Sequence, residues 1–329
     1  MLITGGAGFI GANFVNYTIE NHSEYEICVL DSLTYAGSKS RLDRVLHRID
    51  FVHGDICDAE IVGPLVESAD LVVNFAAESH VDNSLDDSYP FVRTNIIGTY
   101  TLLEAMRRHG GRFHHISTDE VFGDLPLETT EKFTESTPYN PSSPYSASKA
   151  SSDMLVRAWA RSFGVAATLS NCANNYGPFQ HVEKFVPRQI TNLIGGRRPK
   201  VYGTGLNVRE WTHVDDHNAA VHAILSRGEI GESYLIGSGN ELSNRQVVEL
   251  VLDLMGFAPD AYDHVPDRPG HDLRYANDTT KIMTELEWVP RYVDFRDGLA
   301  ETIHWYRANE WWWQPQKMAA EARYQARGQ

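Results

Sequence analysis

Cysteine is scarce in this chain. The 329 residues include three cysteines, Cys28, Cys57 and Cys172, and none belongs to a Cys-x-x-Cys pair. Three isolated cysteines make no complete set of intrachain disulfides, so a disulfide-held scaffold is excluded. This usage predicts a cytoplasmic protein with reduced, buried thiols.

Positive charge is also in short supply. The chain has 29 Lys and Arg residues against 44 Asp and Glu residues, which gives a formal net charge of −15. Nucleic acid and anionic membrane surfaces need a basic face, so neither is expected as a partner. A local cluster of Lys, Arg and backbone N–H groups still suffices for a small anionic ligand.

Long apolar runs are missing too. No run in the sequence reaches the length of a membrane-spanning helix. A glycine-rich turn follows Met1 almost at once, so we expect no secretory signal peptide. No internal repeat is seen. With 42% hydrophobic and 22% charged residues, the chain has the composition of a globular protein with a sizeable core.

What the sequence does contain is a regular alternation of apolar runs and helical patterns. Strands are predicted at 2–4, 25–30, 50–54, 70–77, 112–117 and 165–171, and helices near 11–22, 58–68, 90–109 and 145–163. This alternation predicts an α/β fold with a Rossmann-type, doubly wound parallel sheet.

The rhythm changes after residue 172. A strand is predicted at 200–203 and helices near 184–195, 215–227, 243–255 and 294–309. The last dozen residues, from Met318, are expected to form a frayed helix or to be disordered. We therefore predict a dinucleotide-binding domain at 1–172, to which some later segments return, and a smaller mixed α/β substrate-binding region at 173–329.

The segment "TGGAGFIG" (4–11) is the first motif that carries chemistry. Its glycines fit Gly-x-Gly-x-x-Gly through Gly6, Gly8 and Gly11, or Gly-x-x-Gly-x-x-Gly through Gly5, Gly8 and Gly11. Glycines at a strand-to-helix turn let the backbone approach a pyrophosphate. Asp31 follows twenty residues after Gly11, the spacing of a carboxylate that binds a ribose 2′-hydroxyl. A carboxylate there repels a 2′-phosphate, so the motif favours NAD over NADP.

Two later strand ends extend this cofactor site. The third strand ends at "GDIC", which places Asp55 and Ile56 where an adenine ring would rest, and the fourth ends at "AAESH" (76–80), whose small residues suit close passage of a cofactor. The complete set expected to bind NAD is Gly5, Gly8, Phe9, Ile10, Gly11, Asp31, Ser32, Leu33, Thr34, Asp55, Ile56, Ala76, Ala77, Ser79, Thr94, Tyr145, Lys149 and Asn175.

A tyrosine–lysine pair lies in "SPYSASKA" (143–150). Tyr145 and Lys149 are four residues apart, so both fall on one face of the predicted helix. An ordinary tyrosine is a poor base at neutral pH. A neighbouring ammonium and a cationic nicotinamide would both favour its phenolate.

Adjacent acids follow the fifth predicted strand, in "HISTDEVFGD" (115–124). Thr118, Asp119 and Glu120 stand at its carboxyl end, where parallel sheets bind ligands. Side chains alternate between the faces of a regular strand. Both acids can therefore reach one substrate only if the chain leaves strand geometry near Thr118; otherwise they form a solvated acidic turn.

Together these motifs resemble the extended short-chain dehydrogenase/reductase family, and the Thr-Asp-Glu tip resembles its dTDP-glucose 4,6-dehydratase branch. Further matching segments are "DSLTYAG" (31–37), "AAESHVD" (76–82), "NNYGP" (174–178), "EKF" (183–185), "VYGTGLNVREW" (201–211), "HVDDH" (213–217), "DRPGHDLRY" (267–275) and "WYRANEWWW" (305–313). The resemblance thus spans nearly the whole chain.

The resemblance implies an NAD-dependent hydro-lyase. Oxidation of the sugar at C4 acidifies the proton at C5, so that water can be eliminated across C5 and C6 before hydride returns to C6. By resemblance, Glu120 is the C5 base, Asp119 the acid for the C6 hydroxyl and Tyr145 the group that takes the C4 proton. Thr118 hydrogen-bonds near C4, and Lys149 assists at the nicotinamide ribose.

The resemblance also implies a nucleotide-sugar site in the second region and a homodimer, formed through helices around 91–106 and 145–160. The residues expected to bind substrate are Ser79, His80, Thr118, Asn174, Lys184, Arg188, Lys200, Tyr202, Asn207, Arg209, Asn240, Arg268 and His271. Arginine suits phosphate because it makes bidentate contacts.

Several alternatives stay open at this point. UDP-glucose could replace dTDP-glucose, the reaction could be 4-epimerisation or decarboxylation, and the fold could serve a silent nucleotide-sugar sensor. His213 and His217 are helically spaced, but without a third ligand pattern no metal is expected. The tryptophans of "EWWWQP" (310–315) are expected to pack against the core rather than to bind sugar.

Overall fold

A computed structural model describes residues 1–267 and 271–326. Its centre is a seven-stranded sheet in the order β10-β6-β5-β4-β1-β2-β3, and every pairing in it is parallel. The strands are β1 (Leu2–Thr4), β2 (Ile27–Asp31), β3 (Ile49–His53), β4 (Leu71–Asn74), β5 (Arg112–Thr118), β6 (Ala166–Cys172) and β10 (Ser233–Ile236). This confirms the predicted Rossmann-type fold.

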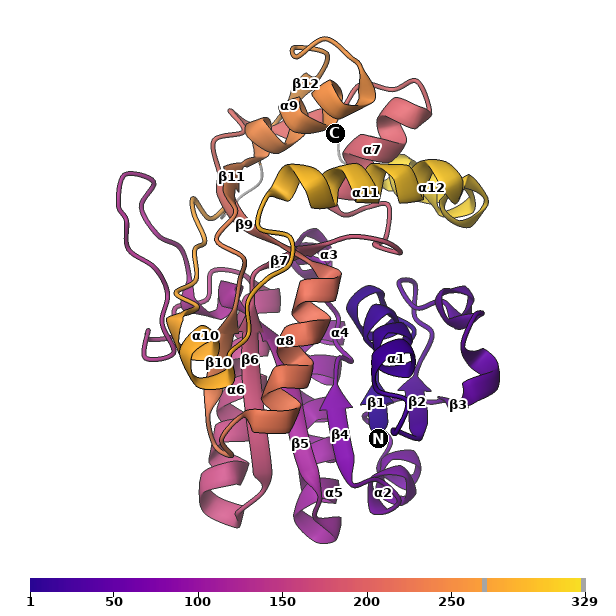
Figure 1. Cartoon of the computed structure of the whole chain (residues 1–329), viewed down its shortest axis with the longest axis vertical. Helices are drawn as coiled ribbons and strands as arrows, with labels where there is room; N and C mark the ends of the chain where they lie inside the picture. The colour runs from indigo at the N-terminus through magenta and orange to yellow at the C-terminus, as the bar shows by residue number, and fades with distance from the viewer. Residues whose placement is uncertain (268–270, 327–329) are drawn as a thin grey trace.

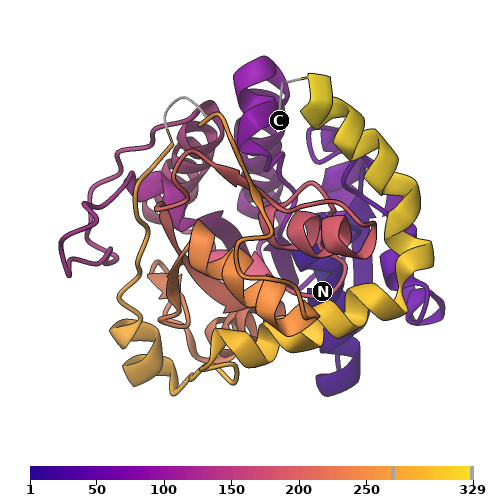
Figure 2. The same cartoon turned by 90° about the horizontal axis from the view of Figure 1, so that it is seen from above.

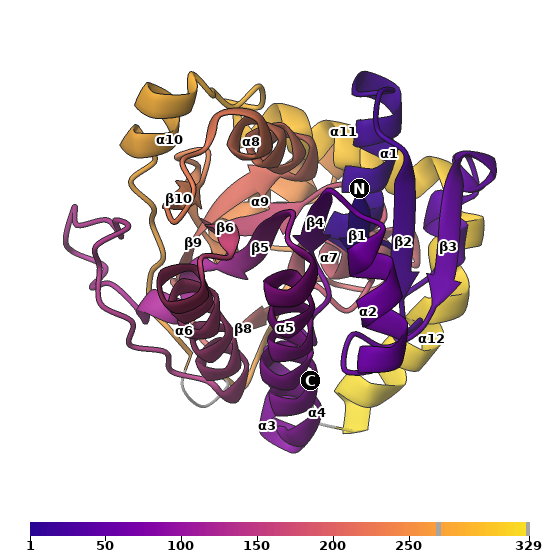
Figure 3. The same ribbon diagram turned by 90° about the horizontal axis from the view of Figure 1, so that it is seen from below.

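Helices cover both faces of this sheet (Figures 1 and 3). One face carries α1 (Phe9–Asn21), α8 (Val214–Arg227) and α10 (Thr280–Leu286). The other carries α2 (Ala59–Glu67), α5 (Thr99–His109) and α6 (Pro144–Phe163). Fully buried strand residues such as Ile3, Val29 and Val73 on one face and Leu2, Leu30 and Val72 on the other explain why the strands read as continuous apolar runs.

Short helices connect these elements. They are η1 (Lys39–Leu42), η2 (Leu46–Arg48), α3 (Val81–Asp86), α4 (Tyr89–Phe91), η3 (Val92–Gly98) and η4 (Asp119–Phe122). The helix predicted near 90–109 is thus one continuous helical stretch, with a wider turn at η3 before α5.

The remaining elements form a smaller body above the carboxyl ends of the strands (Figure 1). It contains the sheet β11-β9-β7, the pair β12-β8, and helices around a separate apolar core. Its bounds are β7 (Asn174–Tyr176), α7 (Phe185–Ile194), β8 (Lys200–Tyr202), β9 (Val208–His213), β11 (Glu241–Ser243), α9 (Asn244–Met255), β12 (Asp263–Val265), α11 (Phe295–Ala308) and α12 (Glu310–Ala326).

The C-terminal end differs from its prediction. Helix α12 is a regular helix that wraps along one side of the molecule (Figure 2). Trp312, Trp313 and Tyr324 are buried, and the Tyr324 hydroxyl donates to the Glu183 carbonyl oxygen at 2.7 Å. For residues 318–326 the expectation of a frayed or disordered end was wrong, because these aromatic side chains anchor the helix. Residues 327–329, which the same expectation covered, lie outside the described residues.

No helix within the two described stretches combines the length and apolarity that crossing a membrane requires.

Candidate active site

The glycine-rich turn brings three segments into close contact. Gly5 has a φ of +69°, and a Cβ at Gly5 would lie 2.6 Å from the Ala76 nitrogen. A Cβ at Gly11 would lie 2.3 Å from the Gly5 carbonyl oxygen. The turn between β1 and α1 therefore needs glycine at both positions, and its residues Gly5, Gly8 and Gly11 line the cavity described below.

Asp31 ends β2 beside this turn. Its carboxylate accepts from the backbone N–H groups of Ala7 and Leu33, both at 2.8 Å. Burial raises the pKa of Asp31, while these two hydrogen bonds and the nearby Arg41 act in the opposite direction. The carboxylate thus fixes the glycine-rich turn, and Asp31 lines the same cavity as that turn.

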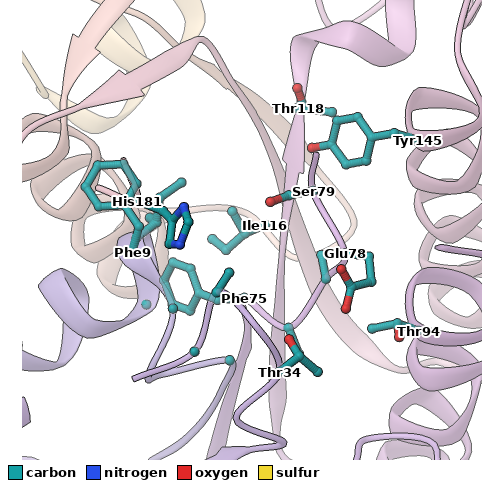
Figure 4. Close-up of a pocket in the computed structure, with 18 of the residues that line it drawn as sticks. Phe9, Thr34, Phe75, Glu78, Ser79, Thr94, Ile116, Thr118, Tyr145 and His181 are labelled. Atoms are coloured by element: carbon teal, nitrogen blue, oxygen red, sulfur yellow. The ribbon is translucent and has the colours of Figure 1, made fainter. Parts of the chain in front are cut away.

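A cavity of about 700 Å³ runs along the carboxyl ends of the strands. Figure 4 shows part of it, with Phe9 and His181 on one side and Thr94 and Tyr145 on the other. Of the expected cofactor set, Gly5, Gly8, Phe9, Ile10, Gly11, Asp31, Ser32, Thr34, Asp55, Ile56, Ala76, Ala77, Ser79, Thr94, Tyr145, Lys149 and Asn175 line it.

One predicted cofactor residue falls outside this set. Leu33 has a φ of +50° and packs against the apolar core instead of lining the cavity in the described part of the chain. Its backbone N–H to Asp31 is its link to the site. The sequence reasoning missed five residues that line the cavity. No motif marks Arg41 of η1, Arg93 of η3 or His181, whereas Tyr35 and Glu78 lie in the matched segments 31–37 and 76–82 without having been singled out.

Asp55 is held differently from the prediction. Its carboxylate pairs with Arg93 at 2.6 Å and accepts from the Cys57 N–H at 2.8 Å. These contacts place a guanidinium, which the sequence reasoning did not consider, at the adenine end of the cavity. Burial raises the pKa of Asp55, but the hydrogen bonds from Cys57 and Arg93 lower it by more. The pKa of Asp55 is therefore below its usual value.

The cavity fits a dinucleotide by its own features. The Gly5–Gly11 cradle leaves no room for side chains where a pyrophosphate would lie. The Asn174 and Asn175 side-chain oxygens are buried without hydrogen-bond partners among the described residues, and both side chains line this cavity. Buried polar atoms of this kind are normally satisfied, so a polar ligand is the natural partner.

Helix α6 carries the tyrosine–lysine pair into this cavity. Ser143 and Ser146 form a capping box at its start, and both Tyr145 and Lys149 are buried. Lys149 Nζ donates to the Ile116 carbonyl oxygen at 2.8 Å and lies 3.3 Å from His115 Nε2. The predicted shared face of the helix is therefore confirmed.

The protein alone does not favour the phenolate. Burial raises the pKa of Tyr145 well above its usual value, Glu120 adds to this, and hydrogen bonding from Thr118 lowers it. Burial lowers the pKa of Lys149, whereas Asp153 and Cys172 raise it. Figure 4 shows the Tyr145 hydroxyl facing Thr118 and Ser79. The expectation that the ammonium would lower the tyrosine pKa is not met by protein groups.

The chain leaves strand geometry where the two acids require it. β5 ends at Thr118, whose side chain accepts from the Glu120 N–H at 3.3 Å and so caps η4. Within this tight turn Asp119 and Glu120 both line the large cavity, along with Tyr145 and Lys149. The two acids therefore do not point to opposite faces of a sheet.

Asp119 and Glu120 have different surroundings. Asp119 is 1% exposed, and burial, Glu120 and Glu210 raise its pKa well above the usual carboxyl range, against smaller effects of Arg209 and Asn277. Glu120 is only partly buried. The pair thus combines a carboxyl group that favours its protonated form with a second carboxyl nearer to solvent.

A second cavity, of about 150 Å³, adjoins the first. The two share Ser79, Glu120, Asn174, Glu183 and Lys184 as lining residues. From the expected substrate set, the second cavity is also lined by His80, Arg188, Lys200, Tyr202, Arg209 and His271. The predicted basic residues thus converge beyond the two acids.

The remaining four expected substrate residues are Thr118, Asn207, Asn240 and Arg268. Within the described chain, Asn207 and Asn240 line neither of these two cavities: Asn207 donates to the Asp272 carbonyl oxygen at 3.1 Å and Asn240 to Ser238 Oγ at 2.9 Å. Both therefore serve loop structure. Thr118 lines the larger cavity, and Arg268 lies outside the described residues.

The sequence reasoning also missed aromatic residues of the second cavity. Tyr275 and Tyr324 line it, with the Arg209 guanidinium 4.2 Å from the Tyr275 ring centre and the Arg188 guanidinium 3.4 Å from that of Tyr324. These rings hold the two arginines in place. Tyr275 belongs to a segment matched by resemblance, whereas Tyr324 belongs to the helix that the prediction had left frayed.

The remaining sequence features have structural roles. His213 caps α8 by accepting from the Asp215 N–H at 3.2 Å, and His217 is fully buried. Among the described residues, no group of three His, Cys, Asp or Glu side chains could hold a metal ion. All three cysteines are free; Cys172 is buried, but Cys28 and Cys57 are only partly so.

Comparison with known proteins agrees with this geometry. The sequence profile of the GDP-mannose 4,6 dehydratase family matches residues 2–302. A dTDP-glucose 4,6-dehydratase of Mycobacterium tuberculosis is 62% identical over 329 residues, covering 100% of this chain and 99% of the relative. One of Mycolicibacterium smegmatis is 60% identical over 329 residues, with the same coverage.

A solved structure is similar over nearly the whole chain. The dTDP-glucose 4,6-dehydratase of Streptomyces venezuelae, crystallised with NAD and TYD bound, has a TM-score of 0.92 and 46% identity, covering 96% of this chain and 99% of that one. In this chain the large cavity is lined by the glycine-rich turn and Asp31. The chain belongs to the dTDP-glucose 4,6-dehydratase family of NAD-dependent hydro-lyases.

Proposed function

We propose that this chain converts dTDP-glucose to dTDP-4-keto-6-deoxyglucose and water. The observation that carries the proposal is the placement of Asp119 and Glu120 in one tight turn, facing the same cavity as Tyr145 and Lys149. Removal of a C5 proton and departure of a C6 hydroxyl need a base and an acid at one sugar. NAD, when bound, supplies a hydride acceptor at C4 and a hydride donor at C6.

Tyr145 is the residue proposed to take the C4 hydroxyl proton. Thr118 hydrogen-bonds its phenol and favours the phenolate. Lys149 is fixed by the Ile116 carbonyl oxygen, so its ammonium stays near the place of the nicotinamide ribose. Because the protein itself holds the tyrosine pKa high, we propose that Tyr145 becomes an effective base only when the positively charged cofactor lies beside it.

The two acids divide the elimination step. Glu120, less buried, is proposed to take the C5 proton, and Asp119 to protonate the departing C6 oxygen. The raised pKa of Asp119 suits this role, since an acid must carry its proton at neutral pH. The hydride taken from C4 then returns to C6, and Glu120 gives its proton back to C5. Because the hydride is returned, the reaction is redox-neutral overall.

The second cavity is proposed to hold the nucleoside diphosphate. Positive charge gathers there in an otherwise acidic chain, from Arg188, Arg209, Lys184 and Lys200.

The division into a cofactor domain at 1–172 and a nucleotide-sugar region at 173–329 is likewise proposed. β10 and α8 lie beyond residue 172 yet pack with the central sheet.

A homodimer formed through η3, α5 and α6 is part of the proposal. These helices expose Val92, Ile97, Tyr100, Met154 and Phe163 on the outer face of the molecule. An apolar face of this kind suits a self-complementary interface.

The free cysteines support a reducing, cytoplasmic setting.

The direct test is incubation of the purified protein and NAD with dTDP-glucose and UDP-glucose in parallel, followed by mass spectrometry. Loss of one water from dTDP-glucose, with slower loss from UDP-glucose, is expected. A 4-epimer, identified by NMR because its mass equals that of the substrate, would mean that an epimerase activity wins. Release of carbon dioxide and a pentose in a third incubation with UDP-glucuronic acid, which carries the C6 carboxylate that decarboxylation needs, would mean that a decarboxylase activity wins. Tight binding of dTDP-glucose without any product would identify a sensor.

A further inference from the structure

Asn277 stands directly behind Asp119. Its side-chain Nδ2 lies 3.3 Å from Asp119 Oδ2 and 3.5 Å from the Ile236 carbonyl oxygen, and the residue is 1% exposed. In the described chain Asn277 lines neither the cofactor cavity nor the adjoining cavity. It therefore touches the acid from the protein side and not from the substrate side.

The position of Asn277 is set by its backbone. Its N–H donates to Glu210 Oε2 at 2.8 Å, while Glu210 Oε1 accepts from the Gly239 N–H at 2.7 Å. On either side of Asn277, the Ala276 carbonyl oxygen accepts from the Phe133 N–H and the Asp278 N–H donates to the Phe133 carbonyl oxygen, both at 2.8 Å. These bonds fix the backbone from which the Asn277 side chain extends to Asp119.

The groups around Asp119 come from several elements. Glu120 of η4, Glu210 and Arg209 of β9, Tyr145 of α6 and Cys172 of β6 interact with it electrostatically. Burial and the two glutamates disfavour its carboxylate, while Arg209 and the Asn277 amide favour it. The Thr118 hydroxyl is 3.5 Å from the other carboxyl oxygen, at the limit of a hydrogen bond. Of these two side-chain donors, Asn277 thus makes the shorter contact with Asp119.

We propose that Asn277 is a positioning residue for the elimination step. When Asp119 acts, its O–H bond breaks, the proton joins the departing C6 oxygen as the C6–O bond breaks, and the carboxyl is left negative. The Asn277 Nδ2–H group already points at Oδ2, so it stabilises that charge as it forms. The inference rests on the proposed function, because it assigns Asp119 as the acid.

The test compares Asn277→Leu with Asn192→Leu. Asn192 is equally buried, donates to a backbone carbonyl oxygen at 3.4 Å, and lines neither cavity. Without the amide, Asp119 becomes a weaker acid. For Asn277→Leu we expect kcat to fall about tenfold, KM for dTDP-glucose to stay unchanged, and the loss of kcat at high pH to move upward by about one pH unit. Asn192→Leu should leave that pH dependence unchanged.

A second variant protects the test against misfolding. Asn277→Asp keeps the size of the side chain and adds a negative charge beside Asp119, so the upward pH shift should be larger still. Infrared difference spectra of each protein against its Asp119→Asn counterpart follow the protonation of Asp119 without relying on turnover. These spectra should show the same upward displacement of the pH at which Asp119 loses its proton.

The outcomes distinguish a failure of the proposed function from a failure of the positioning role of Asn277. If the unmodified protein forms no 4-keto-6-deoxy product, the proposed function fails. If the unmodified protein forms this product, and Asp119 titrates in the folded Asn277 variants at the same pH as in the unmodified protein, the positioning role is refuted. A fall in kcat in Asn277→Leu without any displacement in pH would also refute it, because that result indicates only a structural role.

Discussion

Substitution of Gly11 by alanine would block the cofactor turn at a calculable contact. The new Cβ would lie 2.3 Å from the Gly5 carbonyl oxygen and 3.0 Å from the Gly6 Cα, whereas ordinary contacts begin at 3.4 Å. The turn must therefore open by about 1 Å, since backbone atoms rather than a flexible side chain are in the way. Overpacking of this kind costs about 1–3 kcal/mol, which corresponds to roughly 5- to 150-fold weaker NAD binding.

The assay is NAD retention and calorimetric titration of protein stripped of nucleotide. Gly63→Ala is the matched control, because a Cβ there has nothing within 4 Å and Gly63 lies on α2, outside the cofactor cavity in the described chain. Gly63→Ala should bind NAD as the unmodified protein does. Wild-type affinity in folded Gly11→Ala protein would refute the assignment of this turn as the phosphate cradle.

Three further predictions concern the catalytic and substrate residues. Glu120→Gln should lower kcat by about 10²- to 10⁴-fold. The near-ultraviolet absorbance of bound nicotinamide should still change on mixing with substrate, and normal turnover would contradict the role of Glu120. Asp119 has a folded-state pKa above its unfolded value, so its contribution to stability is present at low pH and is lost as pH rises through the folded pKa. Asp119→Asn should remove that loss of stability. The melting temperature of the variant should therefore exceed that of the unmodified protein by a growing margin as pH rises above about 4. A difference in melting temperature that stays constant with pH would contradict the raised pKa of Asp119. Arg209→Lys should raise KM for dTDP-glucose about tenfold or more, because lysine cannot replace a guanidinium stacked on Tyr275. Arg198→Lys, at an exposed ion pair with Asp263, should leave KM unchanged.

The sequence was sufficient for the parts of the fold that have local signals. Apolar runs bounded by turns located the first six strands, and the spacing between Gly11 and Asp31 located the cofactor turn. The requirement that the chain turn at Thr118 also followed from strand geometry alone. The structure meets it with η4.

Other parts depend on contacts between distant segments. Strand β10 has only four residues and is recognisable as a sheet strand only because it pairs with β6. Helix α12 is polar and alanine-rich near its end, but Tyr324 reaches back to Glu183, 141 residues earlier. Asn277 lies 158 residues from Asp119 in a segment without a motif. No local pattern indicates that these residues meet.

The same limit explains the substrate residues that were misplaced. Asn207 lies in a segment that resembles the family, Asn240 lies outside those segments, and the residue type of both suits phosphate or sugar binding. Their side chains instead satisfy neighbouring loop atoms of the protein. Residue type and motif membership predict proximity to a site, but the direction of a side chain depends on the tertiary hydrogen bonds around it.

In the proposed reaction, oxidation, elimination and reduction all occur at one bound sugar, and Asp119 and Glu120 act on the ketone. The most direct measurement follows dTDP-glucose labelled with deuterium at C4, with the product analysed by NMR and mass spectrometry. We expect a 4-keto-6-deoxy product that has lost one water and carries the deuterium at C6. Deuterium that stays at C4 without loss of water would contradict it.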